Sequence, residues 1–261
     1  MSGEGASVTL PPGYRLVRYE TVGSTNDQAK RLAHDGAPSG TLVWAGAQSQ
    51  GRGRRGRPWE SPCGNLYVSM LLRPACAAAQ AAQLGFVAAL ALADALQRSL
   101  GPRAVEEGAF PPHIALKWPN DVLVNRRKVA GILLESETGR GEAVEFVVIG
   151  IGVNIAAAPA QSEYPATSLA AEGADLTPAA LLERLIAAFD DRYRQWRDAG
   201  FAPVRRAWLE RATGLGEPVR VRLERATLHG RFLDLDGEGA LLLDSADGPR
   251  RIAAGEVFPA I

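Results

Sequence analysis

Four arginines and three glycines alternate closely in residues 51–57, which read GRGRRGR. Guanidinium groups stay charged at every working pH and present a planar donor fork that matches carboxylate and phosphate oxygens. Glycine lets the backbone turn tightly and come close to a ligand. The segment is therefore typical of an anion-binding loop, although Arg/Gly runs also occur in disordered nucleic-acid-binding tails. The whole chain balances 29 basic against 29 acidic residues, so this positive charge is a local concentration.

The position of this segment in the chain favours an ordered loop over a disordered tail. Apolar stretches that are typical of strands lie on both sides of it, at 41–47 and 65–72. A loop fixed at both ends by core strands is held in place by the fold. Its aromatic residue, Trp59, is suited either to anchoring the loop in the core or to stacking on a planar ligand.

Other polar clusters also fall where predicted strands end or helices begin. A strand over 14–20 precedes a helix over 25–36, for which Ser24 or Thr25 is a candidate cap and Thr25 with Gln28 has capping-box spacing. If the strands form one sheet, these ends converge on one rim and suit a ligand that is part apolar and part phosphate. The clusters are Ser24-Thr25-Asn26, Gln48, Lys117 through Asp121 with Lys128, and Asn154.

The sequence lacks the common constellations of covalent or metal chemistry. It contains no evident Ser-His-Asp or Cys-His arrangement, no zinc-ligand spacing, no GxxxxGK[ST] and no strand–GxGxxG–helix unit. Glycines 150 and 152 lie within a predicted strand over 142–155, where they indicate close approach of a backbone or ligand. We therefore expect chemistry based on electrostatic positioning of phosphate.

Composition limits the class of protein. The chain has 261 residues, of which 46% are hydrophobic, enough for a sizeable core. No run of about 18 apolar residues and no signal peptide are evident, so we expect no membrane span and a cytoplasmic protein. Cys63 and Cys76 form no disulfide or metal framework. Zero net charge argues against a general binder of nucleic acid or membrane surfaces.

The predicted elements indicate an α+β protein with a mixed β-sheet, flanking helices and a small second domain. Helices are expected over 80–100, 177–197 and 203–212, and a hairpin over 122–135. After residue 217 the pattern changes to short alternating strands at 218–223, 227–235, 240–243 and 250–254, which suit a small antiparallel barrel packed on the main domain. We expect a flexible stretch over 1–13, a main domain over 14–213 and the barrel over 214–261.

The motifs together resemble the biotin protein ligases. They occur in that family's order and spacing, and the resemblance covers about residues 14–261, although it is weak in the barrel. It implies a class II synthetase-like catalytic domain followed by an SH3-like barrel. The matching segments are Ser24-Thr25-Asn26, residues 51–57, Lys117-Trp118-Pro119-Asn120-Asp121, residues 128–135 (KVAGILLE) and residues 149–154 (IGIGVN).

The resemblance implies a two-step reaction. Biotin is first activated with ATP and Mg²⁺ to biotinyl-5′-AMP, and a lysine of an acceptor protein then displaces AMP. The implied acceptor is a biotin carboxyl carrier protein or domain of acetyl-CoA carboxylase or a related carboxylase. Family members are monomers or dimers, so a homodimer is left open.

The resemblance also implies roles for individual residues. Lys128 matches the catalytic lysine, Arg54 would hold the intermediate, and Asp121 would either bind magnesium or orient the incoming amine. The biotin-binding set would be Ser24, Thr25, Asn26, Gln48, Arg52, Gly53, Arg54, Lys128 and Gly131, with Gly150 and Gly152 flanking the apolar rings. The adenylate-binding set would be Arg54, Arg55, Arg57, Trp59, Lys117 and Asn154, together with the loop at 156–170.

Two departures from the family and three alternatives accompany this interpretation. About 13 residues precede the first predicted strand, so we expect no helix-turn-helix domain and no DNA binding through one. Residues 61–65 are one residue shorter than the family pattern. The alternatives are a lipoate or octanoate ligase of the same fold, whose RRxSGGG-like run is absent, a nucleic-acid-binding module, and a biotin-binding scaffold without activity.

Overall fold

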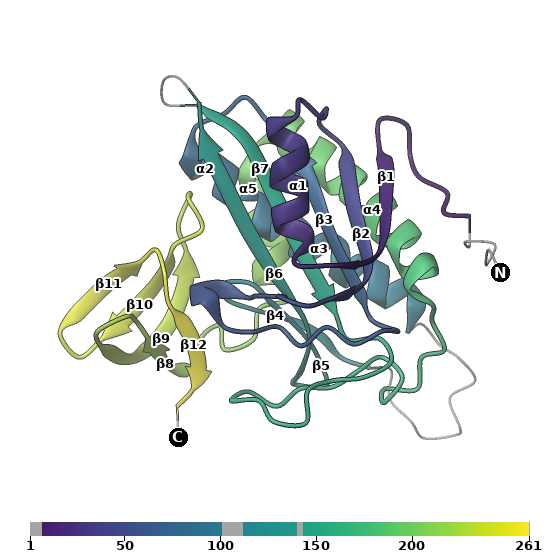
Figure 1. Ribbon diagram of the computed structural model, residues 1–261. Helices are drawn as coiled ribbons and strands as arrows, with labels where there is room; N and C mark the ends of the chain where they lie inside the picture. The colour runs from purple at the N-terminus through teal and green to yellow at the C-terminus, as the bar shows by residue number, and fades with distance from the viewer. Residues whose placement is uncertain (1–6, 101–111, 140–142, 261) are drawn as a thin grey trace.

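The computed structural model describes residues 7–100, 112–139 and 143–260, and its largest element is a seven-stranded mixed sheet (Figure 1). The strand order is β1-β2-β3-β7-β6-β5-β4, with β1 parallel to β2 and every other neighbouring pair antiparallel. The predicted mixed sheet is confirmed. The strands are β1 (Arg15–Val22), β2 (Thr41–Gln48), β3 (Leu66–Leu72), β4 (Ile114–Lys117), β5 (Asp121–Val124), β6 (Arg127–Thr138) and β7 (Val144–Val153).

Helices cover both faces of this sheet (Figure 1). On one face α1 packs against β2, β3 and β7, where Ala29 and Ala33 meet Phe146. The other face carries the remaining helices and the larger core. Burial on both faces explains why the interior strand β3 is hydrophobic along its length apart from Ser69 and the hydroxyl of Tyr67. The helices are α1 (Thr25–His34), α2 (Ala78–Ala82), α3 (Leu84–Ser99), α4 (Pro178–Ala199) and α5 (Phe201–Leu209).

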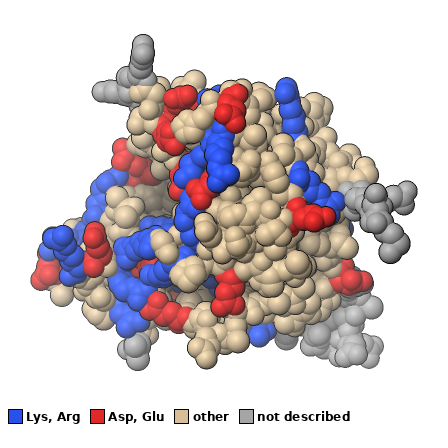
Figure 2. Space-filling model, viewed as in Figure 1, with Lys and Arg blue, Asp and Glu red and all other residues tan. Residues whose placement is uncertain are grey.

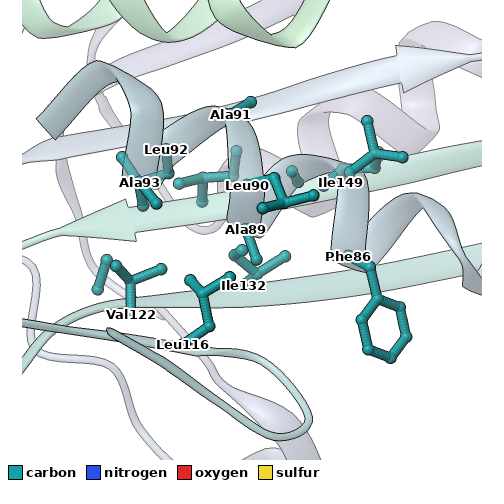
Figure 3. Close-up of a cluster of buried hydrophobic side chains, with 14 of the residues drawn as sticks. Phe86, Ala89, Leu90, Ala91, Leu92, Ala93, Leu116, Val122, Ile132 and Ile149 are labelled. Atoms are coloured by element: carbon teal, nitrogen blue, oxygen red, sulfur yellow. The ribbon is translucent and has the colours of Figure 1, made fainter. Parts of the chain in front are cut away.

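Helix α3 is the centre of the larger core. Figure 3 shows its residue Leu90 close to strand residues that include Ile132 and Ile149. The ring of Phe86 points away from these and packs against Phe201 and Trp208 of α5. The stretch Ala78–Ser99, which spans α2 and α3, is long and apolar enough to cross a membrane by length and composition alone. However, 72% of its apolar window is buried inside the protein. Its apolar character is therefore accounted for by packing, as expected for a core helix.

Two local predictions about helices were wrong. The helix expected over 80–100 is broken at Gln83, whose side chain donates to the carbonyl of Gly237 and accepts from the indole of Trp196. Ser24 is the N-cap of α1, but neither the expected side-chain cap nor the capping box forms. The amide of Gln28 donates instead to the Tyr19 hydroxyl. The sequence also predicts a Gly/Pro-rich loop over 101–113, of which residues 101–111 lie outside the described residues.

The chain ends in a second, five-stranded antiparallel sheet of order β11-β10-β9-β8-β12, the C-terminal sheet (Figure 1). Four strands match the predicted ones, but β12 was missed because its four residues show no clear alternation. β12 pairs with β8 and places its own residues beside the main domain. The strands are β8 (Pro218–Arg222), β9 (Thr227–Leu235), β10 (Leu241–Ser245), β11 (Gly248–Ile252) and β12 (Glu256–Pro259).

A buried contact at the β9–β10 turn joins the two sheets. The indole N–H of Trp118, 1% exposed, donates to the carbonyl of Gly239 at 3.1 Å. Gly239 has φ +87°, and a Cβ there would lie 2.5 Å from the ring of Phe86 in α3. Only glycine satisfies both the left-handed backbone and the close approach. Trp118 therefore positions the C-terminal sheet.

We expect Gly239→Ala to weaken this junction. The substitution combines a left-handed backbone with a clash against Phe86, and it should lower the free energy of unfolding by about 2 kcal/mol. Chemical denaturation measures the loss. Gly237→Ala is the matched control, because that position has an ordinary φ and no atom within 4 Å of the added Cβ. Equal stability of the two variants would contradict the proposed role of Gly239.

Candidate active site

The polar clusters predicted to converge do so around a cavity of about 390 Å³ where the main sheet meets the C-terminal sheet. This volume lies within the range of small-molecule sites. Figure 2 shows Lys and Arg side chains gathered around a hollow on this face. All but one of the predicted site residues line the cavity, namely Ser24, Thr25, Asn26, Gln48, Arg52, Gly53, Arg54, Arg57, Trp59, Lys117, Asp121, Lys128, Gly131 and Asn154.

One end of the cavity is polar, and apart from Arg52 its lining side chains are uncharged. The Gln48 amide oxygen accepts from the backbone N–H of Thr25 at 2.8 Å and lies 3.1 Å from its hydroxyl. Ser69 of β3 donates to the Asn26 amide oxygen at 2.6 Å. Ser24, Thr25 and Asn26 are all at most 5% exposed. These fixed donors and acceptors suit a ligand head that carries both kinds of group, because unpaired burial of such groups is costly.

Glycines make the floor of the cavity. A Cβ on Gly131 would lie 3.0 Å from the indole ring of Trp59, and one on Gly152 would lie 2.6 Å from its Nε1. These two glycines therefore leave the space that the Trp59 ring occupies. Among the described residues this buried indole N–H has no hydrogen-bond partner.

The other end of the cavity carries two lysines that share one carboxylate. Lys128 Nζ lies 2.6 Å from Asp121 Oδ1, and Lys117 Nζ lies 3.4 Å from Asp121 Oδ2. Burial lowers the pKa of Lys117, and the like charge of Lys128 adds to this effect, while Asp121 opposes it. A carboxylate held between two ammonium groups is poorly suited to a dication, because both lysines repel it. The described residues contain no group of three metal-ligand side chains either.

Aromatic side chains close this end. Lys117 Nζ lies 4.8 Å from the ring centre of Tyr164 and 5.2 Å from that of Phe258. Tyr164 comes from the loop after β7, and Phe258 comes from β12. Cation–π contacts of this kind favour the charged lysine in a site that water reaches poorly. Neighbouring Asn154 is 3% exposed and donates to the carbonyl of Thr167 in the same loop.

Residues 51–59, the arginine loop, form a small ordered hairpin. The N–H of Gly53 donates to the carbonyl of Arg57 at 2.7 Å, and the N–H of Trp59 donates to that of Gly51 at 2.9 Å. Arg55 has φ +57°, is exposed and is absent from the lining residues. The prediction that Arg55 contacts the adenylate therefore has no support in this geometry. Tethering by β2 and β3 is confirmed.

The remaining loop arginines point to different partners. Arg54 Nη1 donates to the carbonyl of Gly255 at 3.1 Å, and burial lowers its pKa. Arg57 Nη2 lies 2.6 Å from Glu256 Oε1 of β12. Arg52 turns away from both and pairs with carboxylates on α1 and β6. The sequence analysis assigned Arg52 to biotin and Arg57 to the adenylate, and the structure likewise places these two arginines at different ends of the cavity.

Glu256 links the arginine loop to the C-terminal sheet. It accepts from Arg57 and also from Arg222 of β8, and Arg222 in turn pairs with Glu163 of the loop after β7. Burial opposes ionisation of Glu256, but hydrogen bonds from Arg57 and Arg222 outweigh it and lower the pKa to about 2. One buried carboxylate therefore holds three segments that surround the cavity.

Sequence reasoning missed several residues of this site. Glu256 and Phe258 lie on the undetected strand β12. Tyr164 and Glu163 lie in the loop at 156–170, which was expected to contact the adenylate but within which no single residue was identified. Asp27 and Glu135 could have been identified from the sequence. Asp27 directly follows Ser24-Thr25-Asn26, and Glu135 is the last residue of the segment 128–135. Ser69 is a lone polar residue in an apolar strand, a pattern that points to a buried hydrogen bond.

We expect Glu256→Gln to destabilise the protein by about 2 kcal/mol at pH 7, because Arg57 and Arg222 lose their shared charge partner in a partly buried site. The folded-state pKa of Glu256 lies below its ordinary value of 4.5, so its contribution is complete above pH 4.5. It should disappear as the pH falls towards 2. Chemical denaturation of wild type and Glu256→Gln between pH 7 and pH 3 measures this. If the difference in their free energies of unfolding does not narrow below pH 4.5, the lowered pKa of Glu256 is contradicted.

Comparisons with known proteins agree with this architecture. Residues 19–154 match the Biotin/lipoate A/B protein ligase family, and residues 214–258 match the Biotin protein ligase C terminal domain. The chain is 46% identical to the biotin–[acetyl-CoA-carboxylase] ligase of Paracoccus denitrificans, over 90% of this chain and 96% of that one. It is 34% identical to the bifunctional ligase/repressor BirA of Bacillus subtilis, over 94% of this chain and 74% of that protein.

Solved structures give the same result. The biotin protein ligase of Aquifex aeolicus in complex with biotin and ATP superposes with a TM-score of 0.77 and 28% identity, covering 94% of this chain and 97% of that one. The Leishmania major biotin protein ligase in complex with biotinyl-5-AMP gives a TM-score of 0.60 and 26% identity, covering 96% and 100%. Both sheets of this chain, its cavity and its sequence therefore place it in the biotin protein ligase family.

Proposed function

We propose that this protein activates biotin with ATP to biotinyl-5′-AMP and then transfers the biotinyl group to a lysine of a biotin carboxyl carrier domain. The observation that carries this proposal is the division of one cavity into a polar end, where Asp27 and Glu135 neutralise Arg52, and a cationic end. The polar end has the mixed donors and acceptors that biotin's ureido ring requires. The cationic end lies where the carboxylate of biotin and the phosphates of ATP would meet.

In the first step a carboxylate oxygen of biotin attacks the α-phosphorus of ATP, and the bond to pyrophosphate breaks. Two anions approach one another, so the barrier is lowered by cations held in place beforehand. Lys128 extends into the cavity from the start of β6 and is only partly buried, so it can exchange Asp121 for the reacting oxygens. Lys117, fixed between Tyr164 and Phe258, supports the same charge from behind.

The intermediate must be kept from water, because a mixed anhydride hydrolyses. Arg54 and Arg57 reach the cavity from the arginine loop and are held against β12 and the residue before it. Phosphate oxygens compete for the same guanidinium groups, since both anions match the arginine fork. The loop can then lie over the adenylate, with Trp59 and Asn154 beside it, and limit the entry of water.

In the second step the acceptor lysine attacks the carbonyl of the anhydride, a C–N bond forms, and AMP leaves while the amine loses a proton. Asp121 can orient this amine, because it already binds two ammonium groups. A role of Asp121 as a magnesium ligand fits the geometry less well. We expect Mg²⁺ to arrive with the phosphates of ATP, whose negative charge it neutralises.

A lipoate or octanoate ligase is the nearest alternative within the same fold. Its substrates lack the ureido ring, so they would offer no donors and acceptors to the polar side chains of Thr25, Gln48 and Asn26 that line this end of the cavity. The cytoplasmic location and the absence of DNA binding through a helix-turn-helix domain stay predictions, and a homodimer stays open.

The deciding experiment uses the purified protein with ATP and Mg²⁺ in the absence of any acceptor. We expect mass spectrometry to detect biotinyl-5′-AMP with biotin, and no adenylate with lipoate or octanoate in parallel reactions. A lipoyl or octanoyl adenylate would assign the protein to the sister activity instead. No adenylate from any of the three acids would contradict the proposed function.

We expect Lys128→Met to slow adenylate formation by about 100-fold or more, because the developing charge loses its closest cation. The fold should persist, since Lys128 lies at the edge of the cavity and its methylene stem is kept in the variant. Single-turnover formation of biotinyl-5′-AMP measures the rate, and circular dichroism checks the fold. Arg126→Met, in the exposed turn between β5 and β6, is the control for loss of a positive charge. A folded Lys128 variant with near-normal turnover would remove Lys128 from this role.

A further inference from the structure

Arg52 is the cavity-lining arginine for which the proposed reaction has no use. Its guanidinium donates to both oxygens of Asp27 on α1, at 2.6 and 2.7 Å. Nη2 also lies 3.0 Å from Glu135 Oε2 on β6. This is the bidentate geometry in which an arginine–carboxylate pair is strongest and most specific in direction. Arg52 is therefore fixed to two elements of the main domain.

Lys30 completes a closed cluster of charges. Its Nζ lies 3.3 Å from Asp27 Oδ1 and 3.2 Å from Glu135 Oε1. Two cations and two carboxylates cancel, so Arg52 has no surplus charge for a phosphate. The hydrogen bond from Arg52 lowers the pKa of Asp27. Burial raises the pKa of Glu135, but hydrogen bonds from Asn26, Lys30 and Arg52 outweigh it and lower this pKa, so the cluster stays ionised at neutral pH.

The same cluster reaches the polar end of the cavity through Asn26. The Asn26 amide donates to Glu135 Oε2 at 2.7 Å, while its oxygen accepts from Ser69. Asn26 can take this position because Gly150 beside it has no side chain. A Cβ on Gly150 would lie only 2.1 Å from the Asn26 amide oxygen. Glu135 thus fixes two cavity-lining residues, Asn26 and Arg52. In the described part of the chain, Asp27 and Glu135 themselves do not line the cavity.

The backbone transmits this anchoring to the rest of the arginine loop. Arg52 forms the β-bridge with Pro58 at the centre of the small hairpin. The adjacent backbone hydrogen bonds join Gly53 to Arg57 and Gly51 to Trp59. A shift of Arg52 would therefore move Gly53 on its own strand. Through the bridge to Pro58 it would also move Trp59, whose ring covers Gly131 and Gly152.

We propose that Asp27 and Glu135 are positioning residues that hold Arg52, and through it the base of the arginine loop, over the biotin end of the cavity. This inference rests on the proposed function for its kinetic consequences. It assigns Arg52 to anchoring and leaves Arg54 and Arg57 as the loop cations that face the adenylate. Loss of the anchor should therefore affect biotin binding and retention of the intermediate more than ATP binding.

The test compares Asp27→Asn and Glu135→Gln, which remove charge and keep shape, with the double variant and with Arg52→Lys. In each single variant we expect KM for biotin and the rate of biotinyl-5′-AMP release to rise about tenfold, as for the loss of one charge-assisted hydrogen bond. KM for ATP should change less than twofold. Arg52→Lys, which keeps the charge but loses the fork, should fall between wild type and the double variant.

Glu137→Gln is the matched control. Glu137 lies two residues along the same strand and pairs with His34 at 3.3 Å, without contact to the arginine loop. It should leave both KM values and the release rate at the wild-type level. A cluster that only stabilises the fold would lower the melting temperature and leave the ratio of the two KM values unchanged, and that result would overturn the proposal.

A second measurement does not depend on activity. Trypsin cleaves after arginine, and the exposed Arg55 marks the tip of the loop. If the cluster anchors the loop, limited proteolysis mapped by mass spectrometry should cut at residues 54–57 faster in Glu135→Gln than in wild type or Glu137→Gln. Equal rates would overturn the anchoring. Faster cutting in a protein whose wild type forms no adenylate would support the anchor and reject only the proposed function.

Discussion

Five cations line one cavity of this protein, and their mutual repulsion is the constraint on which the rest of the site depends. Two like charges 4 Å apart repel by about 4 kcal/mol at the effective dielectric constant typical near a protein surface. The cations are Arg52, Arg54, Arg57, Lys117 and Lys128. Four of these five are paired with a carboxylate, while Arg54 donates to a carbonyl group. The site is thus held together by the carboxylates of the chain itself.

Each carboxylate comes from a different part of the fold, so neutralising the cavity also joins the parts. Asp27 belongs to α1, Asp121 to β5 and Glu256 to β12. The C-terminal sheet is consequently part of the site, because it contributes Glu256, Phe258 and the carbonyl of Gly255. The Trp118–Gly239 hydrogen bond fixes the distance across which these contacts form. Trp118, which belongs to the KWPND segment, thus contributes to the site by holding the C-terminal sheet in position.

The sequence was sufficient to predict the mixed sheet, the tethered arginine loop and the convergence of strand-end polar residues, because these follow from periodicity and from where strands end. It was insufficient for the partners of the arginines. Arg52 and Arg57 have the same chemistry and lie five residues apart, yet one faces α1 and the other faces β12. That choice depends on the hairpin formed by residues 51–59 and on a strand whose four residues carry no periodic signal.

The pairing with internal carboxylates also explains how a cation-rich site can be both ordered and ready for an anionic ligand. A free guanidinium cluster would repel itself and stay mobile, and ordering it on binding would cost affinity. Arg57, held by Glu256, is already at the cavity, and a phosphate that replaces the carboxylate exchanges one charge-assisted hydrogen bond for another. Arg52 is held by a bidentate pair with Asp27 and by Glu135 at 3.0 Å, so the same exchange would be unfavourable there. Arg57 is more exposed, and its second carboxylate, Glu163, lies 4.0 Å away. The arginine loop therefore combines a fixed base at Arg52 with an exchangeable contact at Arg57, and the two differ in how tightly the carboxylates of the fold hold them.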